Sequence, residues 1–290
     1  MKRFNINSFI MLLPWIIVFL VFWFYPLLYS GYLSFNDYHT LTKETNFVGL
    51  GNYTKMFSDK LFWKALLNTS IFTLGTVPIT TLIALLLAVL LNNKSTKFKN
   101  FFKSAFFLPT ITSLVVLSLI FSKLYIQDGY VNLILSSMGL HYPKMGWLNN
   151  PDTALLSIMI MDVWAACGYY MLIFIAALQT IPSSIYDSVK LTGASSFYTL
   201  KKITIPLLKP TFIFVLIINL IKSFQIFIEI YIMTKGGPLH STTTLVYMIF
   251  MNGFEKTDAM GYASAISYFL FFLLLILSFF QLSFMKEKQI

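Results

Sequence analysis

Charged residues are scarce in this chain. Only 11% of its 290 residues are Asp, Glu, Lys or Arg, whereas about a quarter of an ordinary soluble domain is charged. Hydrophobic residues make up 57% of the sequence, and several apolar runs near 20 residues or longer carry few or no charges. This composition excludes a soluble globular domain and places the chain among integral membrane proteins.

Cysteine and histidine are also scarce. The single cysteine, Cys167, excludes an internal disulfide, and its position in an apolar run predicts a small core residue. The three histidines (His39, His141 and His240) fall in loop-like stretches, so we predict no haem, no metal site and no cofactor. A Walker-type glycine-lysine motif is missing, which excludes ATP binding by that route.

The net charge of +10 does not indicate nucleic-acid binding, because no basic and aromatic patch of that kind occurs. Lys and Arg instead predict the orientation in the membrane. The N-terminus, the loops after the second and fourth apolar runs and the C-terminus together hold 12 of the 21 Lys and Arg residues, with two acidic residues. The opposite side holds 8 with seven acidic residues. The positive-inside rule then predicts that both termini are cytoplasmic.

Six apolar segments are long enough to cross about 30 Å of hydrocarbon as helices. We predict spans at residues 9–32, 65–91, 104–122, 154–178, 210–234 and 259–285. The first run is longer than a signal-peptide core, so we interpret it as a retained span that Pro14 and Pro26 bend. The predicted fold class is an all-α integral membrane protein with one domain over residues 1–290. No internal repeat is visible, which disfavours a secondary transporter built from inverted halves.

A polar segment, residues 182–206, interrupts this apolar pattern between the fourth and fifth spans. Pro182 suits the entry to a helix, Ser183 or Ser184 is suited to cap it, and Asp187 is expected in its first turn. The residue types alone leave an alternative open, in which a basic amphipathic loop lies on the lipid headgroups.

The second half of the segment predicts a turn and another short helix. Gly193 follows Leu191 and Thr192, where a left-handed residue commonly ends a helix. Ser195 or Ser196 is suited to cap a second helix that runs to Lys202.

The fifth span carries a second group of polar residues. Asn219, Lys222 and Ser223 share one helical face, and Gln225 and Glu229 lie beside it. Ionisable groups at membrane depth usually face a bundle interior or an aqueous cavity. Lys222 and Glu229 are about 10 Å apart along the axis, so the spacing leaves two interpretations open: a solute pathway, or a structural pair with a partner subunit.

The polar segment resembles the cytoplasmic signature of binding-protein-dependent ABC importer permeases, in which Glu-Ala-Ala is followed by Gly and an Ile-x-Leu-Pro ending. The matching residues are Asp187-Ser188-Val189, Gly193 and Ile203-Thr204-Ile205-Pro206. Seven other stretches resemble the carbohydrate-importer branch, which includes maltose and glycerol-3-phosphate permeases. They are NFVGLGNY, FWKALLNT, FFKSAFFLPTI, SFQIFIEIY, GGPLHSTTTLVYMIF, MGYASAIS and ITIPLLKPT.

This resemblance implies the type I ABC importer permease architecture. It also implies a second homologous permease subunit, two ABC ATPase subunits, an extracytoplasmic substrate-binding protein and a sugar substrate. The residues that it assigns to ATPase coupling are Tyr186, Asp187, Ser188, Val189, Thr192, Gly193 and Ala194. Two of its usual features differ here, because Asp-Ser-Val replaces Glu-Ala-Ala and Thr192 replaces an acidic residue before the glycine.

The resemblance also implies substrate contacts on the fourth and fifth spans. They are Tyr169, Asn219 and Ser223, to which the spacing adds Lys222, Gln225 and Glu229. The outer loops, residues 37–64, 123–153 and 235–258, are long enough to contact a binding protein. Asp162 is expected near the outer end of its span, where it would snorkel to the interface, and we assign it no role.

The predicted function is therefore a permease subunit of a sugar or oligosaccharide importer in a bacterial cell membrane, without enzymatic activity of its own. A non-sugar solute such as glycerol-3-phosphate is one alternative. An intramembrane enzyme is another, but Asp162, Lys222 and Glu229 are the only ionisable residues within the spans that could serve it, and they form no nucleophile pattern. An independent channel would leave the folded polar segment unexplained.

Overall fold

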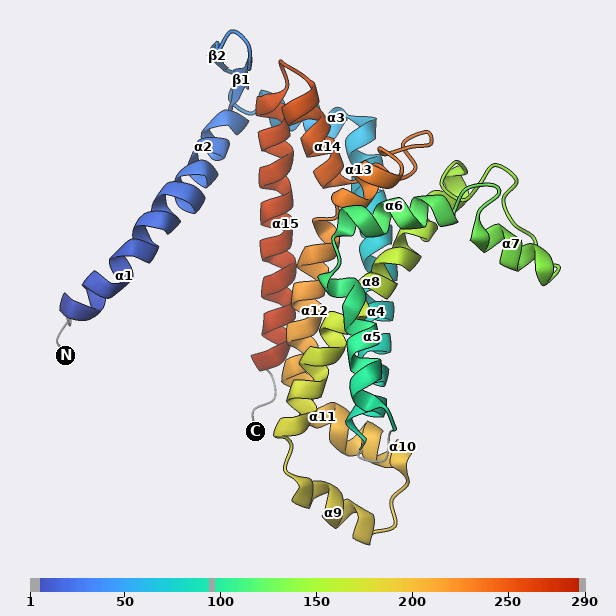
Figure 1. Cartoon of the computed structure of the whole chain (residues 1–290). Coiled ribbons are helices and arrows are strands. Elements are labelled where there is room, and N and C mark those ends of the chain that lie inside the picture. Colours follow the sequence, from blue (N-terminus) through green and yellow to red (C-terminus); the bar gives the residue numbers. More distant parts are fainter. Residues whose placement is uncertain (1–5, 94–96, 287–290) are drawn as a thin grey trace. The chain divides into compact units, whose positions relative to one another are not determined.

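The computed structural model describes residues 6–93 and 97–286, and most of these residues are helical (Figure 1). Its contacts divide the chain into two compact units. One contains the described residues up to Phe62 together with Met248–Leu273, and the other contains Trp63–Tyr247 and the described residues from Leu274 onward. The orientation prediction partly depends on Lys2, Arg3, Lys94 and Lys288, which lie outside the described residues.

Helices follow one another along the chain with short connections. The first three segments are α1 (Ile6–Phe19), the π-helical turn η1 (Leu20–Phe24) and α2 (Tyr25–Ser34). After a hairpin come α3 (Gly51–Ser58), α4 (Lys60–Asn92), α5 (Lys99–Ile111), α6 (Leu114–Leu124), α7 (Tyr130–Ser137) and α8 (Pro151–Thr180). The remainder are α9 (Ser183–Leu191), α10 (Ser196–Thr199), η2 (Leu200–Thr204), α11 (Ile205–Leu207), α12 (Lys209–Phe224), α13 (Ile228–Met233), α14 (Leu245–Phe250), η3 (Met251–Glu255) and α15 (Met260–Lys286).

Five helical segments of the described chain are long and apolar enough to cross a membrane. They are Met11–Ser34, Lys60–Asn92, Pro151–Thr180, Lys209–Met233 and Met260–Ser283. A sixth crossing is obtained only if α5 and α6 form one broken span, because these two helices are bent by 97°. The fold class predicted from the sequence is therefore confirmed, with one span that is not a straight helix.

The predicted span over residues 104–122 is not one continuous helix, because it is interrupted at Thr112 and Ser113. Both residues have extended backbone angles, with ψ of 144° and 126°. Pro109 lies in the last turn of α5, and the β-branched and hydroxyl residues that follow it have low helix propensity. Thr112 further satisfies the helix end by donating its hydroxyl to the carbonyl of Leu108 at 2.9 Å.

Two prolines in the chain each follow a π-helical turn by two residues. Pro26 follows η1, and Pro206 follows η2. A proline ring clashes with the carbonyl four residues before it and supplies no N–H donor. In each turn the hydrogen bond runs five residues back instead, from Tyr25 to Leu20 and from Ile205 to Leu200. The wider turn accommodates the proline without ending the helix.

In the first unit, several hydrogen bonds converge on Asn52. A two-stranded antiparallel hairpin, β1 (Asn36–Tyr38) with β2 (Thr45–Phe47), follows α2 where the sequence analysis expected an outer loop over residues 37–64. The buried Asn52 amide of α3 donates to the carbonyls of Ser34 and Asn36 at 3.0 and 2.9 Å. The amide thereby satisfies two carbonyls where α2 ends and β1 begins.

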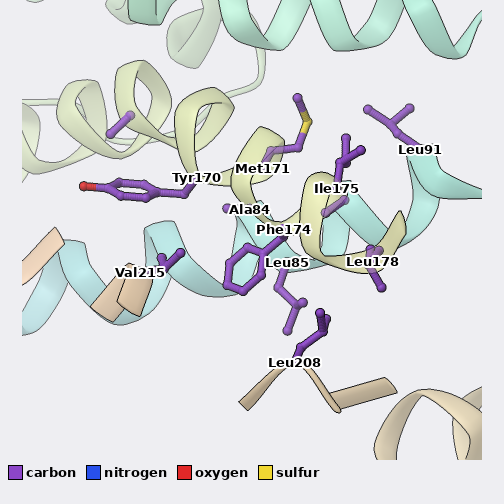
Figure 2. Packing of buried hydrophobic residues seen from close by; sticks show 12 residues of the cluster. Ala84, Leu85, Leu91, Tyr170, Met171, Phe174, Ile175, Leu178, Leu208 and Val215 are labelled. Atoms are coloured by element: carbon purple, nitrogen blue, oxygen red, sulfur yellow. The ribbon is translucent and has the colours of Figure 1, made fainter. Parts of the chain in front are cut away.

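The core of the second unit lies between α4, α8 and α12 (Figure 2). Its members are fully or nearly fully buried: Ala84, Leu85, Ala88, Leu91, Ala166, Tyr170, Met171, Phe174, Ile175, Leu178, Leu208 and Val215. Close packing of α5 against α8 depends on Gly168, since a Cβ there would collide with the carbonyl of Phe106. Cys167 is buried beside it, as predicted.

The connection between α6 and α8 is anchored to the start of α8. The Asn150 side chain caps this helix by accepting from the Asp152 N–H at 2.9 Å, and Pro151 occupies the first turn. Tyr125 donates its hydroxyl to the carbonyl of Ser157 at 3.1 Å. Burial raises the pKa of Tyr125 to about 12, so this hydroxyl stays protonated at neutral pH.

Candidate functional site

The fifth predicted span is a discontinuous helix. It consists of α12 and α13, and residues 225–227 between them are not helical. Phe227 has φ −144° and ψ −57°, outside the helical region. In the hydrocarbon region, irregular backbone is tolerated where it is buried in protein or lines a water-filled cavity. The break is therefore the first structural indication of a solute site.

A cavity of about 230 Å³ lies at this break. It is formed by α4, α6, α8, α12, α13 and the residues between the last two. Its lining residues are Phe72, Leu114, Asp162, Ala166, Asn219, Lys222, Ser223, Gln225, Ile226, Phe227, Ile228 and Glu229. The structure thus brings together all five polar residues that the sequence analysis selected on the fifth span.

The cavity wall carries three ionisable residues. Glu229 is buried, Asp162 is half-buried and Lys222 is exposed. Asp162 lies within electrostatic reach of both Glu229 and Lys222. Among the described residues these three form no ion pair within 4.0 Å. The cavity therefore presents two carboxyl groups and one ammonium group to its interior rather than a closed salt bridge.

Asp162 is the cavity residue to which the sequence analysis assigned no role. It was expected to snorkel to the interface, but it belongs to the wall of the cavity. The helix α8 extends from Pro151 to Thr180, so Asp162 is more than two turns inside it. A charged residue well within an apolar helix could have indicated a buried site, since such residues usually face a bundle interior.

Asn219 and Ser223 connect α12 to α4. The Ser223 and Thr76 hydroxyls lie 3.2 Å apart, and the Asn219 amide approaches the Val77 carbonyl at 3.4 Å. Both side chains are buried. They line the cavity on the side where α12 packs against α4, and both side chains already have hydrogen-bond partners within the protein.

The face of α4 that packs against α12 carries a row of buried threonines, which the sequence analysis did not select. Thr69, Thr73, Thr76 and Thr80 recur at spacings of four, three and four residues, which places them on one helical face. All four are almost completely buried. The hydroxyls of Thr73 and Thr80 have no hydrogen-bond partner among the described residues. Their periodicity in an apolar run could have been noticed in the sequence.

Tyr169 does not belong to the cavity lining. Its side chain is 41% exposed, and its ring packs edge-on against Tyr170 at 5.2 Å between centroids. The neighbouring Tyr170 is fully buried in the core of the second unit. A substrate contact at Tyr169 stays a prediction.

The polar segment forms the helix, turn and second helix expected from its sequence. Gly193 has φ +70° and lies after α9, and no atom lies within 4 Å of the position that a Cβ would take. The Ser195 side chain caps α10 by accepting from the Tyr198 N–H at 3.2 Å. The hydroxyls of Tyr186 in α9 and Thr204 in η2 lie 3.3 Å apart and link α9 to the end of the segment.

The start of α9 differs from the expectation. Pro182 occupies the N-cap position, where no side chain accepts a hydrogen bond from the helix. Ser183 and Ser184 are already helical. Asp187 is the fifth residue of α9, not part of its first turn, and pairs with Lys190 at 3.2 Å on the surface. The fixed φ of Pro182 starts the helix one residue earlier than serine capping would.

α9 has no buried residue. Leu191, at its end, is 91% exposed. The side-chain hydroxyls of Ser188 and Thr192 bond to carbonyls of their own helix, those of Ser184 and Val189. A short helix with little packing of its own is marginal in isolation, so this segment has the properties of a contact surface.

Comparisons with known proteins agree with this geometry. The family described as "Binding-protein-dependent transport system inner membrane component" matches residues 48–286. The Lactose transport system permease protein LacF of Rhizobium radiobacter is 36% identical over 290 residues, covering 99% of this chain and 97% of the relative. The Arabinooligosaccharides transport system permease protein AraP of Bacillus subtilis (strain 168) is 34% identical, covering 91% and 84%.

A similar fold occurs in a solved structure. It is the crystal structure of a bacterial alginate ABC transporter in complex with an alginate pentasaccharide-bound periplasmic protein. The TM-score is 0.81 and the identity 23%, over 95% of this chain and 92% of the other. Sequence family, spans and fold agree: the chain belongs to the inner membrane components of binding-protein-dependent transport systems and is a multi-pass membrane permease.

Proposed function

We propose that this chain is a permease subunit of an ATP-driven ABC importer for a sugar or oligosaccharide. The observation that carries the proposal is the match to the lactose permease over 99% of the chain at 36% identity. The arabinooligosaccharide permease extends the same substrate class to a second relative. The alternative of glycerol-3-phosphate has no specific observation in its favour.

The proposed solute site is the cavity at the break between α12 and α13. Amide and charged groups such as Gln225, Lys222 and Glu229 supply the hydrogen-bond donors and acceptors that sugar hydroxyls require. Its volume of about 230 Å³ is below the range of about 300–1,000 Å³ of ligand pockets. A site of which this chain forms one side, and a second homologous permease the other, accounts for the small volume.

The proposed ATPase contact is the segment from Tyr186 to Ala194. The surface ion pair between Asp187 and Lys190 is exposed on both sides, and such pairs contribute only about 0–1 kcal/mol. Asp187 is therefore free to exchange Lys190 for a basic or amide group of an ATPase. Thr192 bonds only to Val189 of its own helix, so the acidic residue usual at this position has no counterpart here.

The distribution of Lys and Arg supports a cytoplasmic position for this segment and for both termini. Two ATPase subunits would then drive the cycle, with one of them docked on α9. The family description supports a binding protein as the further partner, on the opposite side of the membrane. The alternative of an intramembrane enzyme has no specific observation in its favour either.

Reconstitution tests the proposal. The chain would be co-expressed with the permease, ATPase and binding protein encoded beside it, and uptake of radiolabelled lactose and arabinooligosaccharides would be measured in proteoliposomes. We expect uptake that requires ATP and disappears when this chain is omitted. Transport by this chain alone, without an ATPase, would refute the proposal.

A further inference from the structure

The short helix α7 buries its one asparagine and exposes three of its large apolar or aromatic side chains. Asn132 is only 3% exposed. Tyr130, Leu133 and Ile134 are 71%, 58% and 59% exposed. This arrangement is the reverse of that of an amphipathic helix on a water-soluble surface, which buries its apolar side.

The rotation of α7 about its axis is fixed by Asn132. Its amide donates to the Gln127 carbonyl at 2.8 Å, and its side-chain oxygen accepts from Trp147 Nε1 at 2.7 Å. Gly129 precedes the helix at a close approach, where a Cβ would collide with the carbonyl of Leu124. Buried polar groups that have their partners hold one arrangement, so the outward apolar face is a built feature.

The polar groups among the exposed residues of α7 are the hydroxyls of Tyr130, Ser136 and Ser137. Ser137 shares one face with Leu133 and Ile134 by helical spacing, but its hydroxyl donates to the Ile134 carbonyl at 2.7 Å. Met138 follows and is exposed. Residues 129–140 contain no charged residue. Interfaces between soluble proteins have a polar rim, and the exposed side of α7 has no charged residue that could form one.

Exposed apolar side chains also lie on α6, the helix that precedes α7, and on the connection between them. In Figure 1, α7 lies beyond the end of α6 and apart from α4 and α5. Val116, Leu119 and Ile120 of α6 are exposed, and so is Ile126 in the connection to α7. Tyr130 and Tyr142 of this connection are exposed, and tyrosine is enriched where a membrane meets water.

We infer that α7 is an interfacial helix that lies in the boundary between lipid headgroups and acyl chains. Tyr130, Leu133, Ile134 and Met138 face the acyl chains, and Asn132 holds the helix against the protein from the other side. Helices of this kind bury their apolar face about 5–10 Å into the boundary. The lipid contact anchors the connection between α6 and α8, and α6 in turn borders the cavity through Leu114.

Spin-label accessibility tests this inference on the full-length chain in its assembled complex. Leu133→Cys and Ile134→Cys would be made in a Cys167→Ala background, labelled with a nitroxide and reconstituted in phosphatidylcholine–phosphatidylglycerol vesicles. Gln127→Cys is the matched control, because Gln127 is exposed in the same connection but precedes α7. Frequent collisions of the nitroxide with oxygen indicate that the label lies in lipid, and frequent collisions with a water-soluble nickel chelate indicate that it lies in water.

We expect both α7 labels to collide more with oxygen than with the nickel chelate, at a depth of about 5–10 Å below the phosphates. The Gln127 label should collide mainly with the nickel chelate. Two results would overturn the inference. Access of the nickel chelate to Leu133 and Ile134 equal to that at Gln127 would place α7 in water. Protection of both labels from both reagents would mean that a protein partner covers the helix.

Discussion

Replacement of Gly193 perturbs the ATPase-contact segment without touching the rest of the fold. The residue has φ +70°, and the space around its Cβ position is open. A side chain at this position therefore adds no collision, and the only cost is the left-handed backbone. That cost is about 1–2 kcal/mol for an L-residue, which corresponds to a roughly 5- to 30-fold lower population of this turn.

Three substitutions separate the effect of backbone from that of size. Gly193→Ala is expected to reduce ATP-driven uptake by roughly 5- to 30-fold. Gly193→Val should reduce it further, because a β-branched residue at positive φ is a genuine outlier. Gly193→Asn should retain most uptake, because asparagine is tolerated at this position of a helix end.

The assay is uptake by the reconstituted importer, with the amount of each variant in the membrane and its co-purification with the ATPase measured alongside. All three variants should insert normally, since α9 has no buried residue. Wild-type uptake by Gly193→Val would contradict the coupling role. Equal loss with Asn and Val would show that backbone conformation is not the cause.

The other predictions concern the cavity and the packing beneath it. Lys222→Met should lower uptake by about tenfold or more, because loss of a hydrogen bond to a charged group costs about 1.5–3 kcal/mol. The control is Lys209→Met, which replaces an exposed lysine. Equal uptake by the two variants would show that Lys222 is not part of the solute pathway. Gly168→Ala should lower the Tm of the purified complex, because its Cβ collides with the rigid carbonyl of Phe106. Gly75→Ala should leave the Tm unchanged or raise it, because its Cβ meets only the flexible end of Met159 and alanine favours helices by about 1 kcal/mol relative to glycine. A lower Tm for Gly75→Ala than for Gly168→Ala would contradict the packing described for α5 and α8.

The sequence predicted the helices well because long apolar runs have few alternatives in a membrane. It predicted the turn at Gly193 and a cap at Ser195 or Ser196, of which Ser195 is the cap in the structure, since both features follow from local backbone chemistry. It did not predict the bend at Thr112 and Ser113 or the break after Phe224. Both lie in windows that stay apolar on either side, so hydropathy alone does not distinguish a broken helix from a straight one.

The cavity could be predicted only in part. The helical periodicity of α12 selected Asn219, Lys222 and Ser223 correctly as one face. Periodicity within one helix does not reveal which residues of another helix it meets, and Asp162 was missed for this reason. The inward orientation of Asn132 was missed for the same reason, because its partners are backbone carbonyls and Trp147 rather than a sequence pattern.

Site-specific cross-linking from α9 tests the central claim most directly. A photoreactive amino acid in place of Leu191, which is 91% exposed, would be activated in the assembled complex with and without ATP. We predict a cross-link to the ATPase subunit in both states. Cross-links to lipid or to this chain alone, with none to an ATPase, would contradict the claim that this segment couples the permease to ATP hydrolysis.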